Sequence, residues 1–363
     1  MRLQHSPALD GIRAGAVVLV MLYHASLPVH GGHIGVNVFF VLSGFLITSL
    51  LLQERLSSGR IAFGKFWMRR VLRLYPALLA LIVVVTVYSL SIPDAVRSEE
   101  SLWGWFPAML YFSNWVRAFN GLGSLGLYEH TWSLSIEEQF YVVWPIVLWL
   151  IFRISANLRT VAWVAAIGCA ASLATRLIVA PGPEGYERIF NGLDTQGDQL
   201  LFGCLLAAIV MVAARDGWTH KLRKALGLLT VPAFAALLAL AFLWPHHGVS
   251  LMMRVAMSVV GISAACVIGY VYVASQSWLS RALGMRVLVY IGTRSYGLYL
   301  WHYPIFVIMS GVAPTPILIP LELALSFIAA ELSFRLIETP FLKIKNRLRR
   351  ETKAKGELST STR

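Results

Sequence analysis

Long apolar stretches alternate with short polar connections along almost the whole chain. A stretch of roughly 17–25 apolar residues is long enough to cross the hydrocarbon core of a bilayer as a helix. Such stretches occur near residues 10–28, 34–52, 75–92, 134–152, 160–180, 196–213, 225–243, 250–274, 294–311 and 317–341. The pattern therefore predicts an all-α, polytopic integral membrane protein with about ten transmembrane helices.

Residues 103–115 do not fit this pattern. The segment is short, rich in Trp and broken by Pro107, and Trp is enriched where a membrane meets water. We expect this segment to lie at the outer interface rather than to span the membrane. The first apolar stretch leads into Pro28 and Gly-rich chain instead of a small-residue cleavage site, so it is expected to remain as a span.

The composition agrees with a membrane protein and adds an orientation. The chain is 57% hydrophobic and 13% charged, whereas soluble domains carry about a quarter charged residues. Its net charge is +13. With ten spans and a cytoplasmic N-terminus, the inner segments hold 24 Lys and Arg and the outer loops hold three, the bias known for cytoplasmic loops. The charge thus indicates that both termini are cytoplasmic, and nucleic-acid binding is the disfavoured explanation. Residues 1–342 are expected to form the transmembrane domain, and 343–363 a basic cytoplasmic tail.

Two groups that can carry charge lie in the first span. Arg13 and His24 are eleven residues apart, which at about 100° per residue is within about 20° of three full turns. Alone, the arginine would be expected to extend towards the interface and the histidine to be a packed core residue. Together on one face, they indicate two points along an internal cavity.

Three arginines end the loop before the third span. Arg69, Arg70 and Arg73 have helical spacing at the predicted cytoplasmic surface. They could anchor the chain to lipid phosphates, or they could clamp the phosphates of an anionic cofactor, because guanidinium groups bind phosphate oxygens bidentately. In the second span, Ser43 and Gly44 would let a neighbouring helix approach closely, and Asn37 could simply be hydrated.

Further polar residues lie in the later spans. Glu138 has capping-box spacing from Ser135, whereas Glu137 has no such explanation and could orient the imidazole of His24. The ninth span carries a polar stripe formed by Ser295, Tyr299 and His302. The sixth span begins with two aspartates, Asp194 and Asp198. Glu331 and Arg335 have the spacing of an ion pair. The three cysteines lie in separate apolar runs, which argues against disulfides or a zinc site, and no metal site is predicted.

Six motifs in order resemble those of the acyltransferase-3 family, the bacterial membrane O-acyltransferases of polysaccharides, peptidoglycan, lipopolysaccharide and macrolides. The sequence contains no Gly-x-Ser-x-Gly motif of serine hydrolases, no phosphate-binding P-loop motif and no His-Glu-x-x-His zinc motif. The motifs that carry the resemblance are Leu9-Asp-Gly-Ile-Arg-Ala14, His24, Gly35-Val-Asn-Val-Phe-Phe-Val-Leu-Ser-Gly-Phe-Leu-Ile47, Arg69-Arg-Val-Leu-Arg-Leu-Tyr-Pro76, Trp132-Ser-Leu-Ser-Ile-Glu-Glu-Gln-Phe-Tyr141 and Ser295-Tyr-Gly-Leu-Tyr-Leu-Trp-His302.

The resemblance implies acyl transfer, with acetyl as the usual group, from cytoplasmic acyl-CoA to a hydroxyl of a carbohydrate or macrolide at the bacterial inner membrane. Acyl-CoA would be a co-substrate, with no tightly bound cofactor. His24, Arg13 and Glu137 would be catalytic, the three arginines and Ser43 would bind the cofactor, and the supporting residues would be Asn37, Glu138, Trp132, Ser295, Tyr299, His302 and Asp198. Many members carry Asp where this chain has Asn37, and many have Arg just before the position of Asp198. The alternatives are a transporter or proton-coupled permease that uses the same polar groups, and a membrane scaffold.

Overall fold

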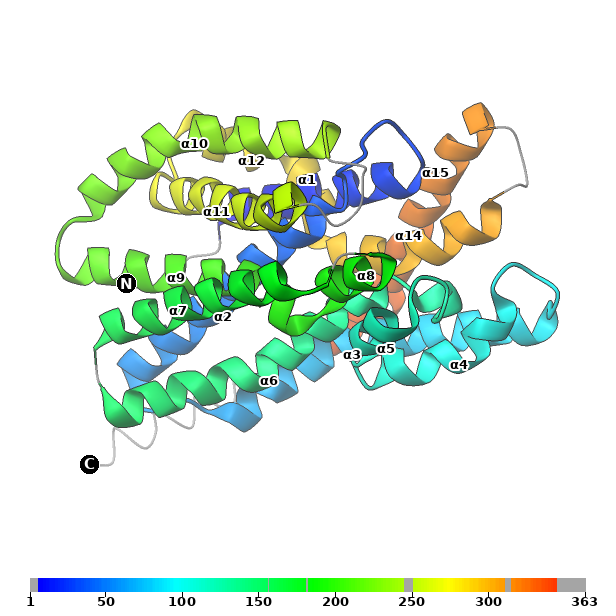
Figure 1. The fold of residues 1–363 in the computed structure, drawn as a ribbon, viewed down its shortest axis with the longest axis horizontal. Coiled ribbons are helices and arrows are strands. Elements are labelled where there is room, and N and C mark those ends of the chain that lie inside the picture. Colours follow the sequence, from blue (N-terminus) through cyan, green and yellow to red (C-terminus); the bar gives the residue numbers. More distant parts are fainter. Residues whose placement is uncertain (1–5, 156, 181, 245–250, 311–314, 345–363) are drawn as a thin grey trace.

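The computed structural model describes residues 6–155, 157–180, 182–244, 251–310 and 315–344, and every regular element within them is helical. The predicted tail therefore lies almost wholly outside the described residues. The long helices are α1 (Pro7–His24), α2 (Ile34–Ser58), α3 (Phe63–Ser91), α6 (Thr131–Ile154), α7 (Leu158–Ile178), α9 (Leu193–Arg215), α10 (Thr219–Phe242), α11 (Leu251–Val273), α14 (Ser295–Met309) and α15 (Thr315–Ser333) (Figure 1). The short ones are α4 (Ser98–Met109), α5 (Ser113–Asn120), η1 (Gly126–Tyr128), α8 (Pro183–Asn191), α12 (Trp278–Leu283), α13 (Arg286–Thr293) and the π-helical η2 (Phe334–Glu338).

The polytopic all-α fold is confirmed. Eight helices in the described residues are long and apolar enough to cross a membrane, among them α2, α3 and α6. Helices α1 and α14 occupy the two other predicted positions but have only 18 and 15 residues. At 1.5 Å per residue α14 is about 22 Å long, shorter than a hydrocarbon core of about 30 Å, so the count of ten spans is not established.

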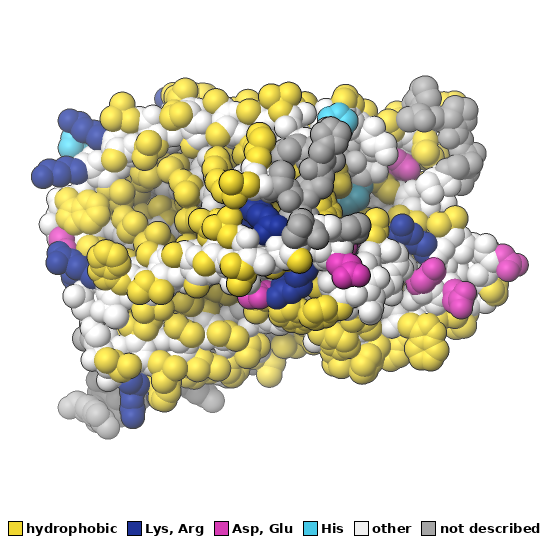
Figure 2. Space-filling view, viewed as in Figure 1, with side chains coloured by type: hydrophobic (Ala, Val, Ile, Leu, Met, Phe, Trp, Pro, Cys, Tyr) yellow, Lys and Arg dark blue, Asp and Glu magenta, His cyan; other side chains and the backbone are white. Residues whose placement is uncertain are grey.

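The long helices run side by side along the long axis of the molecule (Figure 1). The connections α2–α3, α6–α7 and α9–α10 lie at one end, called here the turn end, and α4, α5 and α8 lie at the opposite, short-helix end. Lys and Arg side chains mark the turn end, and acidic side chains gather over the short helices, with apolar side chains along the flank between them (Figure 2). The segment predicted to be interfacial is divided between α4 and α5, which are too short to span.

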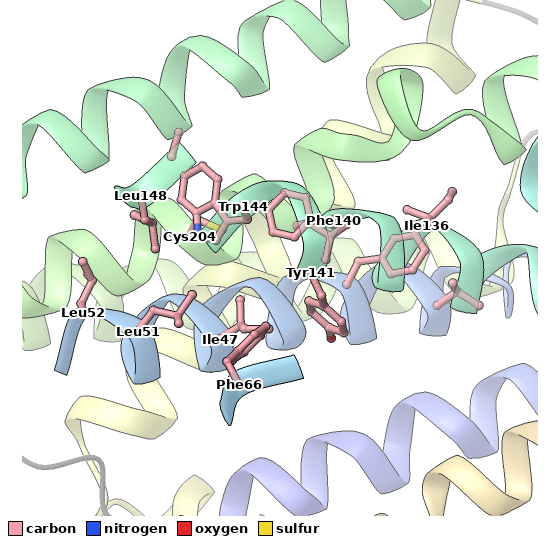
Figure 3. Packing of buried hydrophobic residues seen from close by; sticks show 14 of the residues in the cluster. Ile47, Leu51, Leu52, Phe66, Ile136, Phe140, Tyr141, Trp144, Leu148 and Cys204 are labelled. Atoms are coloured by element: carbon pink, nitrogen blue, oxygen red, sulfur yellow. The ribbon is translucent and has the colours of Figure 1, made fainter. Parts of the chain in front are cut away.

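The core is formed by apolar side chains between the long helices. Ile47 and Leu51 of α2 pack with Phe140 and Trp144 of α6 (Figure 3), and all four are buried. The indole Nε1 of Trp144 donates a hydrogen bond to Thr48 Oγ1 at 2.8 Å, so the polar atom of this large ring is satisfied inside the core.

Helices α2 and α9 approach closely because each has a glycine that faces the backbone of the other helix. A Cβ atom at Gly44 would lie 1.9 Å from the Leu200 carbonyl oxygen, and one at Gly203 would lie 2.0 Å from the Val41 carbonyl oxygen. Any side chain at either position would force the helices apart. The close approach predicted for the Ser43–Gly44 step is thus confirmed, and it holds the polar face of α2 at a fixed position.

One capping prediction is wrong. Helix α6 begins at Thr131, four residues before Ser135, so Ser135 and Glu138 lie inside the helix and form no capping box. The right-handed helical backbone already begins at Glu129 and His130, just upstream of Thr131, so the first turn of α6 precedes Ser135. Glu138 is therefore not a capping residue of α6.

Candidate active site

A cavity of about 1080 Å³ opens between α1, α2, α3, α6 and α14. Eight of the fourteen residues singled out from the sequence line it, so segments far apart in the chain meet at one place. The polar side chains of its wall include Asp10, Arg13, Ser43, Arg69, Arg70, Arg73, Ser133, Glu137, Ser295 and Tyr299.

The three arginines of α3 face this cavity. Arg69 lies 3.9 Å from the Glu54 carboxylate, and the Arg70 guanidinium carbon lies 3.9 Å from the centre of the Tyr141 ring. Neither Arg70 nor Arg73 forms an ion pair within 4.0 Å among the described residues. Two partly buried guanidinium groups without a carboxylate partner make this wall suited to bind an anion.

Ser43 and Glu137 of the cavity wall form a hydrogen-bonded group with the buried Tyr141. The Ser43 hydroxyl donates to Glu137 Oε1 at 3.0 Å and lies 2.5 Å from the Tyr141 hydroxyl, and Tyr141 in turn lies 3.3 Å from Glu137 Oε2. The Arg70 guanidinium stacks on this tyrosine ring. Glu137 is therefore held by hydroxyl groups and a nearby cation, and not by His24, as the sequence had suggested.

Arg13 contributes the α1 side of the cavity. Its Nη1 lies 3.2 Å from Asp10 Oδ1, one turn earlier on the same helix. Asp10 belongs to the first turn of α1, whose N-cap is Ser6. The guanidinium is thus oriented by a carboxylate on its own helix and remains in the cavity wall, where the predicted face of α1 places it.

Ser133 and Tyr299 lie together in the cavity wall. Their hydroxyls are 2.6 Å apart, and the Tyr299 hydroxyl also lies 2.9 Å from the His130 carbonyl oxygen. His302 follows Tyr299 on α14, about 4.5 Å further along the helix axis. Its Nε2 lies 3.3 Å from Nδ1 of His24.

His24 does not line the cavity, unlike Arg13, and contacts His302 one turn beyond the lining residue Tyr299. Its ring is partly exposed and packs against Tyr23, His302 and Tyr303, with ring centres 5.1–5.4 Å away. Helix α1 connects the two predicted points, with Arg13 in the cavity and His24 about 16 Å further along the axis. The shared face predicted from their spacing is consistent with this arrangement.

Besides His24 and His302, four predicted residues lie outside the cavity wall: Asn37, Trp132, Glu138 and Asp198. Asn37 is buried and donates to Gln196 Oε1 at 3.0 Å, so the expectation that it is hydrated is wrong. Trp132 packs edge-on against Phe40. Glu138 has a buried carboxylate oxygen, Oε1, without a hydrogen bond to any described residue. It lies on the helix that carries Glu137, close enough to Arg70 and Arg73 for electrostatic attraction.

Asp198 belongs to a separate buried ion pair. Its two carboxylate oxygens accept hydrogen bonds of 2.7 and 2.5 Å from Arg176 of α7, and Ser258 of α11 donates to the same carboxylate at 2.9 Å. Both charged side chains are fully buried. The arrangement joins three helices and does not reach the cavity, so Asp198 is placed as a structural group. The predicted Glu331–Arg335 pair is present, and Arg294 also binds Glu331.

Three residues of the site were not singled out from the sequence: Tyr141, Ser133 and His130. Tyr141 follows Glu137 by four residues, a spacing that places both on one face of a helix, so this signal was available. Ser133 and His130 become part of the site only through contacts with α14, which no local pattern predicts.

Comparisons with known proteins assign the chain to a family. A family model described as an acyltransferase domain matches residues 6–332. The chain is 34% identical to the peptidoglycan O-acetyltransferase OatA of Listeria monocytogenes, over 94% of this chain and 56% of that protein. It is also 34% identical to the O-acetyltransferase OatA of Staphylococcus aureus, over 94% of this chain and 58% of that protein. The chain thus spans little more than half the length of these relatives. No solved structure matches it significantly. With the family model covering nearly the whole chain, the protein belongs to the acyltransferase-3 family.

Proposed function

We propose that this chain is a multi-pass protein of the bacterial cell membrane that transfers an acetyl group from acetyl-CoA to a hydroxyl of a cell-envelope glycan. Family membership and the names of the relatives support O-acetyl transfer. The transporter alternative receives no such support. The observation that carries the donor assignment is that Arg70 and Arg73 line the cavity and neither forms an ion pair within 4.0 Å with a described carboxylate.

The cavity supplies what a coenzyme A thioester needs. Arg70 and Arg73 would bind its phosphates through charge-assisted hydrogen bonds, with Arg69 beside them. The pantetheine arm would pass Ser43 and Arg13 towards Tyr299. Because the arginines lie nearer the turn end, where basic side chains gather, this end would face the cytoplasm and both termini would be cytoplasmic.

The transfer step follows from the position of His24. Nε2 of His24 would take the proton of the acceptor hydroxyl as that oxygen bonds to the thioester carbonyl carbon. The carbon–sulfur bond then breaks, and the sulfur leaves as the CoA thiol after receiving the proton from His24. Arg13, about 16 Å from His24 along α1, would contact the pantetheine arm of the donor, and Glu137 would hold Ser43 in the cavity wall together with the buried Tyr141.

The acceptor would approach from the short-helix end. His24 ends α1 near that end and is partly exposed. The relative from Listeria is named for peptidoglycan, a carbohydrate polymer with free hydroxyl groups. We therefore propose a glycan of the same class as the acceptor for this chain.

The purified chain in liposomes would test this proposal. Acetyl-CoA carrying a labelled acetyl group is supplied to the turn end, and soluble peptidoglycan fragments to the short-helix end. Release of CoA together with label in a base-sensitive ester on the fragments is expected. His24→Ala should lower transfer by roughly 10²–10⁴-fold while acetyl-CoA still binds. A folded chain that binds acetyl-CoA but forms neither free CoA nor ester would overturn the proposal.

A further inference from the structure

The imidazole of His24 is held from one side by groups that define where its proton lies. Its Nδ1 is 3.0 Å from the Val20 carbonyl oxygen and 3.3 Å from Nε2 of His302. Its Nε2 makes no hydrogen bond to any described residue. The two nitrogens of this ring are therefore in different environments, one engaged by the protein and one free for a substrate.

The carbonyl groups fix the tautomers of both histidines. A carbonyl oxygen can only accept, so Nδ1 of His24 must carry the hydrogen that faces Val20. The same holds for Nδ1 of His302, which lies 2.8 Å from the Tyr299 carbonyl and 3.1 Å from the Leu298 carbonyl. A neutral imidazole has one N–H group, so Nε2 of His302 carries no hydrogen. It can therefore accept a hydrogen bond from the Nδ1–H group of His24.

We propose that His302 is the positioning residue of His24: it accepts the Nδ1–H hydrogen bond and thereby aims the basic Nε2 of His24 at the acceptor hydroxyl. This inference rests on the proposed acetyl transfer. His302 is fully buried whereas His24 is partly exposed, so His302 acts through His24 and not on the substrate.

A neutral partner suits this place in the membrane. When His24 takes the hydroxyl proton it becomes a cation with two N–H groups, and Nδ1–H continues to donate to Val20 and His302. A carboxylate in the position of His302 would have to be buried as a charge before each reaction, at considerable cost in a medium of low polarity. Glu137, the carboxylate expected from the sequence to do this, is instead bound to Ser43 and Tyr141.

The surrounding rings restrict both imidazoles. Tyr303 packs edge-on against His24, with ring centres 5.4 Å apart, and stacks on His130 at 5.1 Å. His130 is buried, and neither of its ring nitrogens has a hydrogen bond of normal geometry to a described residue. His130 thus packs beside the pair without competing for its hydrogen bond.

Two substitutions of similar size separate hydrogen bonding from packing. The carbonyl oxygen of a glutamine at position 302 can reach the place of the imidazole Nε2 and accept from His24, whereas methionine fills the space with only a weak acceptor. His302→Met should lower kcat about tenfold to a hundredfold, by analogy with the hydrogen-bond partners of metal-binding histidines, with the KM for acetyl-CoA unchanged. His302→Gln should retain most of the lost kcat. His33→Met is the control, because His33 packs on Tyr23 and makes no hydrogen bond to His24.

The outcomes are distinct. Equal kcat values for His302→Met and His302→Gln, in variants of equal thermal stability, would overturn the inference. So would nitrogen chemical shifts of isotope-labelled histidine that show the Nε2–H tautomer for His24 in the wild-type protein. A wild-type chain that transfers no acetyl group would instead overturn the proposed function, and the tautomer measurement would still decide the hydrogen bond.

Discussion

Removing the two arginines of the cavity that form no close ion pair with a described residue tests the site for the donor most directly. Hydrogen bonds from charged groups contribute about 1.5–3 kcal/mol each, with the lower part of this range expected in an open, hydrated cavity. Replacing Arg70 and Arg73 together by glutamine should therefore raise the KM for acetyl-CoA at least tenfold, which corresponds to about 1.4 kcal/mol. Arg69 is left in place because it faces Glu54.

The structure also predicts that these substitutions leave the fold intact. Neither side chain is in an ion pair within 4.0 Å of a described carboxylate, so Glu137 and Glu138 lose only a longer-range attraction, and Glu137 keeps its hydrogen bonds to Ser43 and Tyr141. The main loss is the contact of Arg70 with the Tyr141 ring, which is worth about 0.5–2 kcal/mol. Thermal unfolding in detergent should therefore change little.

Steady-state kinetics and direct binding of acetyl-CoA would be measured together, since KM equals a dissociation constant only when chemistry is slow. Arg55→Gln is the matched control: it removes a guanidinium at the same end of the molecule, where Arg55 lies over Phe152 and not in the cavity wall. Unchanged KM and unchanged binding in a well-expressed double variant would refute the clamp and favour an anchor for lipid phosphates.

Three further predictions concern geometry, stability and orientation. Exchanging His24 and Ala25 should abolish transfer as fully as His24→Ala, because one residue turns the side chain by about 100°; near-normal transfer would contradict the catalytic assignment. Arg176→Met should destabilise the protein by about 3–5 kcal/mol in thermal unfolding, and adding Asp198→Leu should restore most of this; a harmless single variant would show that the pair is not buried as described. A cysteine at exposed Asp94, in a chain without its native cysteines, should react with an impermeant reagent on intact cells; labelling only after the inner face is opened would reverse the topology.

The sequence by itself determined which segments are helical and which faces of them are polar. Apolar stretches of membrane length were sufficient to predict most of the long helices, because a bilayer requires every backbone group to be paired within its own segment. The periodicity of 3.6 residues was sufficient to group Ser295, Tyr299 and His302, and to place Arg13 on the cavity side of α1. The length, Trp content and Pro107 of residues 103–115 were sufficient to predict that this segment does not form a spanning helix.

Only the tertiary structure decided which polar faces meet. Glu137 is joined to Ser43, 94 residues away, and His24 to His302, 278 residues away, whereas the sequence had suggested Glu137 as the partner of His24. Asp198 had the same sequence signature as a site residue, yet it pairs with Arg176 away from the cavity. The physical reason is that periodicity fixes a direction within one helix but not its neighbour. The neighbour is set by backbone contacts such as those of Gly44 and Gly203, which bring α2 against α9 and so determine what each polar stripe faces.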